Sequence, residues 1–258
     1  MVHHNNVHHI FRIKVNNFRI KVKYKSKKMN KKYFRGGHIH IKQLLASTLL
    51  ICCSLFSSAQ PFKADIAAFA SMDSIVAPLK GKILLAGSSS FTKWKDINQY
   101  FSGYPIINRG FGGSTLLDVI YYAQETIIKY EPKQIIIYCG ENDLASSDTV
   151  TPAMVLGRFT TLFNLLRHKL NKKTQIAFVS LKPSVSRWHL DNKYVETNKL
   201  IKSFLATKPN TIFINVHDAM LTENGTVMKD IFIGDNLHMN AKGYAIWQKI
   251  IAPQLLIL

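Results

Sequence analysis

From residue 80 onward, the chain alternates short apolar runs with longer segments whose apolar residues recur at helical spacing. Runs that are apolar at every position and rich in β-branched residues are typical of strands buried on both faces of a sheet. The predicted strands are 82–86, 105–107, 134–139, 175–180 and 211–216. Because helical segments separate these strands, the pattern predicts an α/β fold in which helices cover both faces of a parallel sheet.

The helical segments are predicted at 115–130, 152–170 and 193–206, and a final helix starts near Asn240, a favourable N-cap. The second segment places a set of large apolar residues on one face, namely Met154, Phe159, Leu162, Phe163 and Leu166. The final helix is expected to direct four apolar residues inward, namely Tyr244, Trp247, Ile250 and Ile251.

Composition supports a globular chain and divides it in two. The 258 residues are 47% hydrophobic and 19% charged, which is too apolar for a disordered chain. The net charge of +19 would favour a nucleic-acid or anionic-membrane partner if it were spread over the chain. However, residues 1–59 hold 12 Lys/Arg and no acid, whereas residues 60–258 hold 22 Lys/Arg and 15 acids. The N-terminal segment therefore needs a separate explanation.

An apolar run at 43–56 follows Lys31, Lys32, Arg35 and Lys42 and leads into small residues that end at Ala59. A basic region, a short apolar region and small residues at the cut are typical of a secretory signal peptide. The run is too short to span a bilayer. We expect a signal peptide at 29–59, export to the periplasm or beyond, and membrane contact only during export. A buried helix and an uncleaved anchor are the alternatives.

Residues 1–28 form a basic head that contains a near-duplicate, Phe11 to Val15 and Phe18 to Val22. Since Met29 begins a signal peptide of ordinary length, these residues are interpreted as sequence upstream of the true start. The alternative is a cationic arm that binds phosphates and stacks aromatic rings on bases. We expect no nucleic-acid partner.

Cysteine usage agrees with this division. Cys52 and Cys53 lie in the apolar run and leave with it, so the mature chain would hold Cys139 alone and form no intrachain disulfide. Cys139 ends a predicted strand and is interpreted as a small buried residue. No Cys/His spacing typical of zinc occurs, and no metal or cofactor is expected.

Polar and glycine-rich segments follow the predicted strands. Because ligands of parallel sheets bind at the carboxyl ends of strands, these segments are the candidates for chemistry. They are Gly87-Ser88-Ser89-Ser90, Asn108-Arg109-Gly110-Phe111-Gly112-Gly113-Ser114, Gly140-Glu141-Asn142-Asp143 and Gly234-Asp235-Asn236-Leu237-His238. Each alone is a weak signal, but four in succession point to one site.

Together these segments supply the parts of a serine hydrolase. A serine hydroxyl needs a base to take its proton, and the base needs a third group to orient it. Ser89 is the predicted nucleophile, His238 the base and Asp235 the orienting group. The backbone N–H groups of Ser89 and Gly113 and the side-chain amide of Asn142 are the predicted oxyanion donors.

With these four blocks in this order, the chain resembles the SGNH hydrolases, also called GDSL lipases and esterases. The resemblance runs from about residue 80 to the last helix and implies a hydrolase domain at 60–258. It implies a flavodoxin-like three-layer α/β/α sandwich with five parallel strands. It also implies a metal-independent Ser/His/Asp mechanism that hydrolyses acyl esters or thioesters.

One position departs from the family pattern, since Ser88 stands where the family usually has Asp. Ser88, Ser89 and Ser90 are all chemically able to attack, and only the third position of the motif selects Ser89. Arg109 and the loop 182–188 either line the substrate pocket or have a structural role. Besides His238, the histidines of residues 60–258 are His168, His189 and His217, and they are interpreted as structural.

The sequence thus predicts an exported serine esterase for small acyl esters, including acetyl groups on glycans, because the short loops leave no room for a lipid tunnel. Lysophospholipase and thioesterase activity are alternatives within the family. A binding module that keeps the fold without turnover is the alternative from another class. The oligomeric state stays open.

Overall fold

The computed structural model describes residues 7–15, 18–26 and 61–257, in two compact units, Met1–Ala59 and Gln60–Leu258. The predicted signal peptide lies outside the described residues. In the first unit, β1 (Val7–Val15) and β2 (Phe18–Ser26) pair antiparallel, with Phe11 opposite Val22. The two near-duplicate segments therefore pair with each other, a hairpin that is not among the predicted elements.

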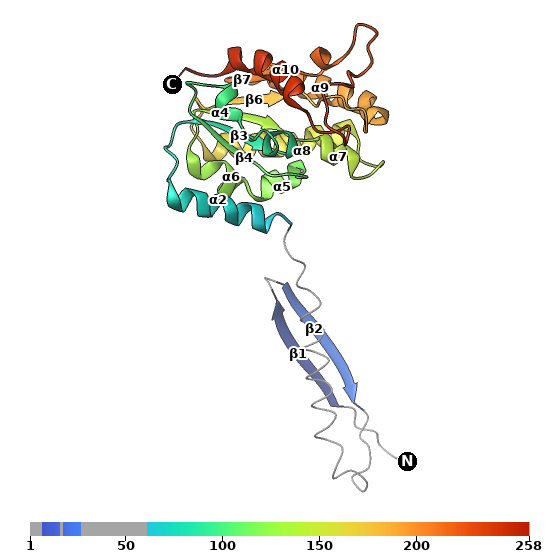
Figure 1. Ribbon diagram of the computed structural model, residues 1–258. Coiled ribbons are helices and arrows are strands. Elements are labelled where there is room, and N and C mark those ends of the chain that lie inside the picture. The colour runs from blue at the N-terminus through green and yellow to red at the C-terminus, as the bar shows by residue number, and fades with distance from the viewer. Residues whose placement is uncertain (1–6, 16–17, 27–60, 258) are drawn as a thin grey trace, which may run out of the picture. The chain divides into compact units, whose positions relative to one another are not determined.

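The second unit is built on a five-stranded parallel sheet with the order β4-β3-β5-β6-β7 (Figure 1). The strands are β3 (Ile83–Gly87), β4 (Ile106–Gly110), β5 (Gln134–Tyr138), β6 (Gln175–Val179) and β7 (Thr211–Ile214). All five predicted strands are confirmed, with ends that differ by at most three residues. The second strand of the sheet in sequence lies outside the first, which is the flavodoxin-like order.

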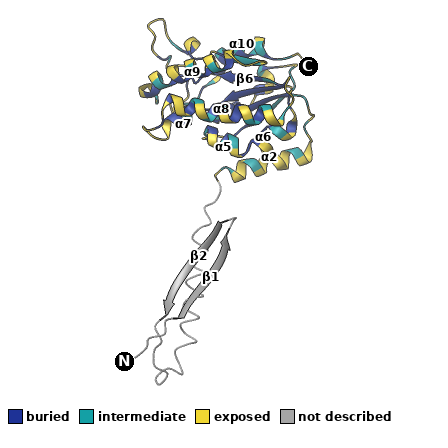
Figure 2. Cartoon of the chain, turned by 180° about the vertical axis from the view of Figure 1, so that it is seen from behind, coloured by how far each residue is buried: buried dark blue, intermediate teal, exposed yellow. Residues whose placement is uncertain are grey.

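Alternate residues of the strands enter two cores, as the two-residue period of a strand requires. Leu84 of β3 and Ile135 of β5 face one core, while Ile83 and Ile136 face the other. Figure 2 shows the strands buried between helices whose outer faces are exposed. The expected three-layer α/β/α arrangement is confirmed.

One core is covered by α5 (Leu116–Tyr121), α6 (Ala123–Thr126), α8 (Pro152–Lys169) and α9 (Asp191–Ala206). The other is covered by α3 (Ser89–Thr92), α4 (Ile97–Tyr100) and α10 (Ala241–Ile251). The remaining elements are α2 (Lys63–Ile75), α7 (Glu141–Ala145), η1 (Ile128–Tyr130), η2 (Trp188–Leu190), η3 (Asp218–Met220) and η4 (Ala252–Gln254). In the described part of the chain, no helix is long and apolar enough to cross a membrane.

Two helix predictions need correction. The continuous helix at 115–130 is wrong, because the chain leaves helical geometry at Tyr122 and Ile127 and forms α5, α6 and η1 instead. Between these breaks, the Thr126 hydroxyl donates to the Tyr122 carbonyl at 2.8 Å, and such side-chain bonds are neutral to unfavourable in a helix interior. In α8, Met154 is 45% exposed, whereas the other four residues of its predicted face are buried.

Arg109 holds α2 against the rest of the unit. Its guanidinium pairs with Asp73 of α2, donates to the Tyr130 hydroxyl at 2.7 Å and lies over the Phe69 ring at 5.1 Å. Burial raises the pKa of Asp73, but hydrogen bonds from Lys129, Tyr130 and Arg109 outweigh it and lower that pKa overall. Arg109 is 6% exposed, and its contacts with α2 favour the structural role of the two that the sequence left open.

Candidate active site

The predicted nucleophile turn lies where β3 ends beside β5. Gly87 has φ +129°, and a Cβ there would lie 1.9 Å from the Tyr138 carbonyl oxygen, so only glycine fits. The next N–H, that of Ser88, donates to the same carbonyl at 3.0 Å. This bond fixes the chain as it enters α3, whose first residue is Ser89.

Of the three serines, Ser89 is the accessible one. Ser88 and Ser90 are each 3% exposed, whereas Ser89 is half-buried. Within the described part of the chain, the Ser89 hydroxyl has no hydrogen-bond partner, His238 included. Such bonds between nucleophile and base are often long before substrate binds. Access to an acyl carbon therefore favours Ser89, as the sequence motif does.

The glycine block follows β4 and packs closely against the serine turn. Gly110 pairs with Gly87 across the sheet, and a Cβ on Gly110 would lie 2.8 Å from the Phe91 Cβ. Gly113 has φ +86°, a conformation that favours glycine. The N–H groups of Gly113 and Ser89 have no acceptor among residues 61–257. Two predicted oxyanion donors are therefore available in the absence of substrate.

Asn142, the third predicted donor, lies at the start of α7 and contacts the serine turn directly. Its Nδ2 donates to Ser88 Oγ at 2.7 Å and to the Ser114 carbonyl at 3.1 Å. Both amide hydrogens are thus engaged, so an oxyanion has to share or replace one of these acceptors. Ser88, at the position where the resembled family usually has Asp, is thus an acceptor for the Asn142 N–H.

Asp235 and His238 form the expected pair. His238 Nδ1 lies 2.6 Å from Asp235 Oδ2, and the N–H groups of Leu237 and His238 both donate to Oδ1 at 2.9 Å. Partial burial raises the pKa of Asp235, but the bonds from His238 and Leu237 outweigh it and hold that pKa well below its usual range. An ionised carboxylate on Nδ1 fixes the tautomer in which Nε2 can accept a proton.

A buried ionic network joins the serine turn to the His238 loop. Lys182, which follows β6 and is 1% exposed, donates to the Leu237 carbonyl at 2.9 Å and pairs with Glu141 at 3.4 Å. The Tyr138 hydroxyl also donates to Glu141. Burial lowers the pKa of Lys182, and the charge of Glu141 opposes that shift.

Arg187 completes this network from the same loop. Its Nη1 lies 3.1 Å from Glu141 Oε1 and 3.0 Å from Asn142 Oδ1. One residue earlier, the Ser186 N–H donates to the Asn236 carbonyl at 3.0 Å. The loop after β6 is therefore in contact with both the oxyanion side and the acid–base side of the site. One sequence feature could have indicated the role of this loop: it directly follows a buried strand and contains two basic residues, Lys182 and Arg187.

His217 has partners that its sequence context does not suggest. At the exit of β7, its ring nitrogens lie 3.0 Å from Asp191 and 3.1 Å from Asp218. Burial lowers the pKa of His217, but the bonds to these two carboxylates outweigh it and raise that pKa overall. Since Asp191 begins α9, His217 links this helix to the sheet, in agreement with the structural interpretation.

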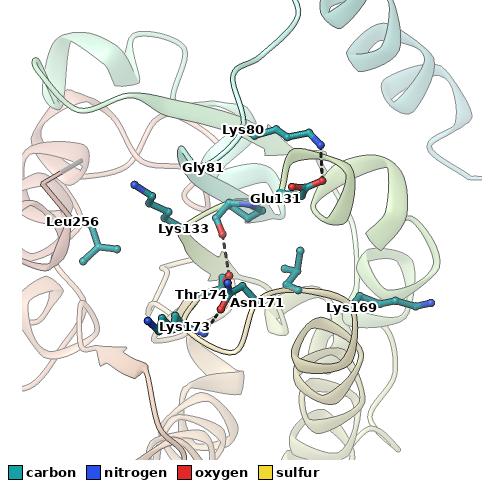
Figure 3. Close-up of a pocket in the computed structure, with 11 residues that line it drawn as sticks. Lys80, Gly81, Glu131, Lys133, Lys169, Asn171, Lys173, Thr174 and Leu256 are labelled. Atoms are coloured by element: carbon teal, nitrogen blue, oxygen red, sulfur yellow. Dashed lines mark hydrogen bonds and ion pairs between the residues drawn. The ribbon is translucent and has the colours of Figure 1, made fainter.

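One cavity among the described residues lies away from these groups. It has a volume of about 720 Å³ and is lined by residues that precede strands, including Gly81, Lys133 and Thr174 (Figure 3). The predicted catalytic residues follow the strands, at the opposite edge of the sheet. This basic cavity is therefore not the active site.

The fold recurs in solved structures of other proteins. A candidate platelet activating factor from Streptococcus pneumonia shares 18% identity at a TM-score of 0.67, over 84% of this chain and 99% of that chain. A GDSL-like lipase from Bacteroides thetaiotaomicron VPI-5482 shares 18% identity at a TM-score of 0.62, over 74% and 97%. A variant of an acetyl-xylooligosaccharide esterase from Geobacillus Stearmophilus shares 14% identity at a TM-score of 0.56, over 68% and 94%. No curated protein matches the chain.

The sequence itself carries the family assignment. The family model described as GDSL-like Lipase/Acylhydrolase matches residues 73–246, about two thirds of the chain. All four strand exits that carry the motif lie within this match, and they converge at one edge of a sheet with the order expected for the fold. The protein therefore belongs to the GDSL-like lipase/acylhydrolase family and is an ester-bond hydrolase.

Proposed function

We propose that the protein is an exported serine esterase that removes small acyl groups through an acyl-serine intermediate. The observation that carries this proposal is the pairing of His238 Nδ1 with Asp235 at 2.6 Å. This pairing leaves the second imidazole nitrogen available. The loop that carries His238 is bonded to Ser186 and Lys182. Lys182 pairs with Glu141, and the next residue, Asn142, donates to the serine turn.

In the acylation step, Ser89 Oγ attacks the acyl carbon and its proton passes to His238 Nε2. The carbonyl π bond breaks, and its electron pair settles on the acyl oxygen. The N–H groups of Ser89 and Gly113 donate to this oxyanion, with Asn142 Nδ2 as a third donor. When the tetrahedral intermediate collapses, the ester C–O bond breaks and His238 returns the proton to the departing alcohol.

Deacylation repeats these steps with water. His238 takes a proton from the water as it attacks the acyl-serine, and the same donors stabilise the second oxyanion. Collapse releases the carboxylic acid and restores the Ser89 hydroxyl. Asp235 stays ionised throughout and stabilises the imidazolium that forms twice in each cycle. The lowered pKa of Asp235 agrees with that role.

Small acyl esters on a carbohydrate are the favoured substrates. Two similar structures are described as an acetyl esterase and an acetyl-xylooligosaccharide esterase. In this chain, Trp188 directly follows Arg187, which contacts Asn142, and it is 38% exposed, so it is a candidate aromatic contact for a substrate. Aromatic faces are suited to stacking on sugar rings. Lysophospholipids and thioesters are the alternative substrates.

Kinetics of two alanine variants test the assignment of the nucleophile. With p-nitrophenyl acetate, Ser89→Ala is expected to lower kcat by at least about a thousandfold, because loss of a triad member leaves only binding and the oxyanion donors. Ser90→Ala, a buried neighbour outside the site, is the matched control and retains most activity. Undiminished turnover by Ser89→Ala would contradict the proposal, and inactivity of the unaltered protein would favour the binding module.

A substrate panel tests the acyl and alcohol parts. It compares p-nitrophenyl esters of two to twelve carbons, acetylated xylo-oligosaccharides, lysophosphatidylcholine and an acyl-thioester. The proposal predicts the highest kcat/KM for acetyl esters and a steady fall with chain length. A maximum at long chains or on lysophosphatidylcholine would assign the protein to the alternative substrates instead.

A further inference from the structure

The side chain of Asn142 is fixed by groups that distinguish its oxygen from its nitrogen. The Ser114 carbonyl can only accept, and it lies 3.1 Å from Nδ2. The Arg187 guanidinium can only donate, and it lies 3.0 Å from Oδ1. Ser88 Oγ accepts or donates with equal ease, so it does not select an orientation by itself. Arg187 and the Ser114 carbonyl therefore select the same orientation of the amide, and Arg187 is the charged group of the two.

Arg187 is itself held by a buried carboxylate. Glu141 is 5% exposed and contacts Arg187 through Oε1 and Lys182 through Oε2. Because Glu141 is the residue before Asn142, the guanidinium spans two consecutive side chains of the same turn. This arrangement leaves the guanidinium little freedom, although its side chain is 22% exposed.

A cation that donates to an amide oxygen also increases the strength of the amide N–H groups as hydrogen-bond donors. Hydrogen bonds in series polarise one another, so a charged donor on Oδ1 makes the Nδ2 hydrogens stronger donors. In an oxyanion hole, the strength and aim of each donor act directly on the barrier to reaction. Arg187 thus meets both requirements without contacting the reacting atoms.

We propose that Arg187 is a positioning residue of the oxyanion hole, which orients the Asn142 amide and strengthens its N–H as a donor to the transition state. This inference rests on the proposed function, because it acts through the role assigned to Asn142. Loss of a direct oxyanion donor costs about 100- to 1,000-fold in kcat. Since Arg187 acts through that donor, its loss is expected to lower kcat by about 10- to 100-fold while KM changes by less than about threefold.

The test compares Arg187→Met with a matched arginine, Arg158 of α8, whose partner Asp143 lies in the same turn as Glu141 and Asn142. Arg158 pairs with Asp143 at 2.7 Å, its side chain is 20% exposed, and it does not contact Asn142. Arg158→Met therefore removes a similar ion pair, and its kcat with p-nitrophenyl acetate is expected to stay within about threefold of the unaltered protein. Equal falls in kcat for both variants would assign Arg187 a general structural role and overturn the inference.

A double-mutant cycle with Asn142→Ala separates positioning from direct effects. If Arg187 acts through Asn142, Arg187→Met lowers kcat no further once Asn142 is alanine. A full additional loss in that background would contradict the inference. Arg187→Lys serves if the methionine variant does not fold, and it is expected to recover part of kcat, since its ammonium keeps the charge and can donate but lacks the rigid planar geometry of the guanidinium. Failure of the proposed function would be seen separately, as undiminished turnover by the Ser89→Ala variant.

Discussion

The buried ammonium of Lys182 offers a direct test of how the site is held together. Lys182→Met keeps most of the apolar length of the side chain but removes its charge and its donors. Glu141 keeps Arg187 and Tyr138 as partners, whereas the Leu237 carbonyl loses the donor that lies 2.9 Å away. The substitution therefore affects the connection between the sheet and the His238 loop.

The magnitude follows from these contacts. At 3.4 Å and an effective dielectric constant of about 20, the attraction between Lys182 and Glu141 is about 5 kcal/mol before desolvation. Burial of the ammonium offsets much of this attraction. A buried acceptor left without its donor costs about 1–3 kcal/mol. We therefore expect Lys182→Met to lower the free energy of unfolding by about 2–3 kcal/mol and Tm by about 5–10 °C.

Urea denaturation at pH 7, followed by tryptophan fluorescence, measures this change. Lys202→Met is the control, because Lys202 is exposed on α9 and its loss should change stability by less than about 0.5 kcal/mol. If Lys182→Met is as stable as the control, the contacts of Lys182 do not hold the His238 loop and the reasoning fails.

Three further predictions concern the backbone, the pH dependence and the N-terminus. Gly87→Ala is expected to destabilise by more than about 3 kcal/mol in urea denaturation, since its Cβ would overlap the Tyr138 carbonyl, whereas Gly157→Ala, with open space around it, should be neutral or stabilising by about 0.5–1 kcal/mol. The raised pKa of His217 means that its contribution to stability is complete below its unfolded value of 6.5 and is lost as pH rises through the folded value. Between pH 6 and 9, the free energy of unfolding of His217→Gln should therefore fall less than that of the unaltered protein. Parallel plots of this free energy against pH would contradict the stabilising role of protonated His217. If the proposed export and cleavage take place, mass spectrometry of the mature protein is expected to find Gln60 at its N-terminus, and a chain that keeps residues 1–28 would contradict the start-site interpretation.

The sheet and the order of the motif blocks were predictable because they depend on local patterns. Continuous apolar runs identify buried strands, and a parallel sheet brings every strand exit to one edge. The residues after 86, 107, 139 and 216 were therefore expected near one another. The contact between Asn142 and Ser88 and the pairing of Asp235 with His238 both agree with that expectation.

The parts that sequence patterns missed depend on contacts between distant residues. The Arg187 bond to Asn142 joins positions 45 apart, and no periodicity encodes it. The pairing of Arg109 with Asp73 joins positions 36 apart and fixes α2, a helix that has no buried residue and that the sequence patterns did not predict. The division of 115–130 into three short pieces reflects Thr126 and the burial of Ile127, which outweigh a regular helical pattern.

Intact-mass spectrometry of the acyl-enzyme tests the central claim most directly. After a rapid quench of the reaction with p-nitrophenyl acetate, the account predicts one acetyl adduct, located on Ser89 by peptide mapping and absent from Ser89→Ala. An adduct on Ser88 or Ser90, or turnover by Ser89→Ala with no adduct at any serine, would contradict it.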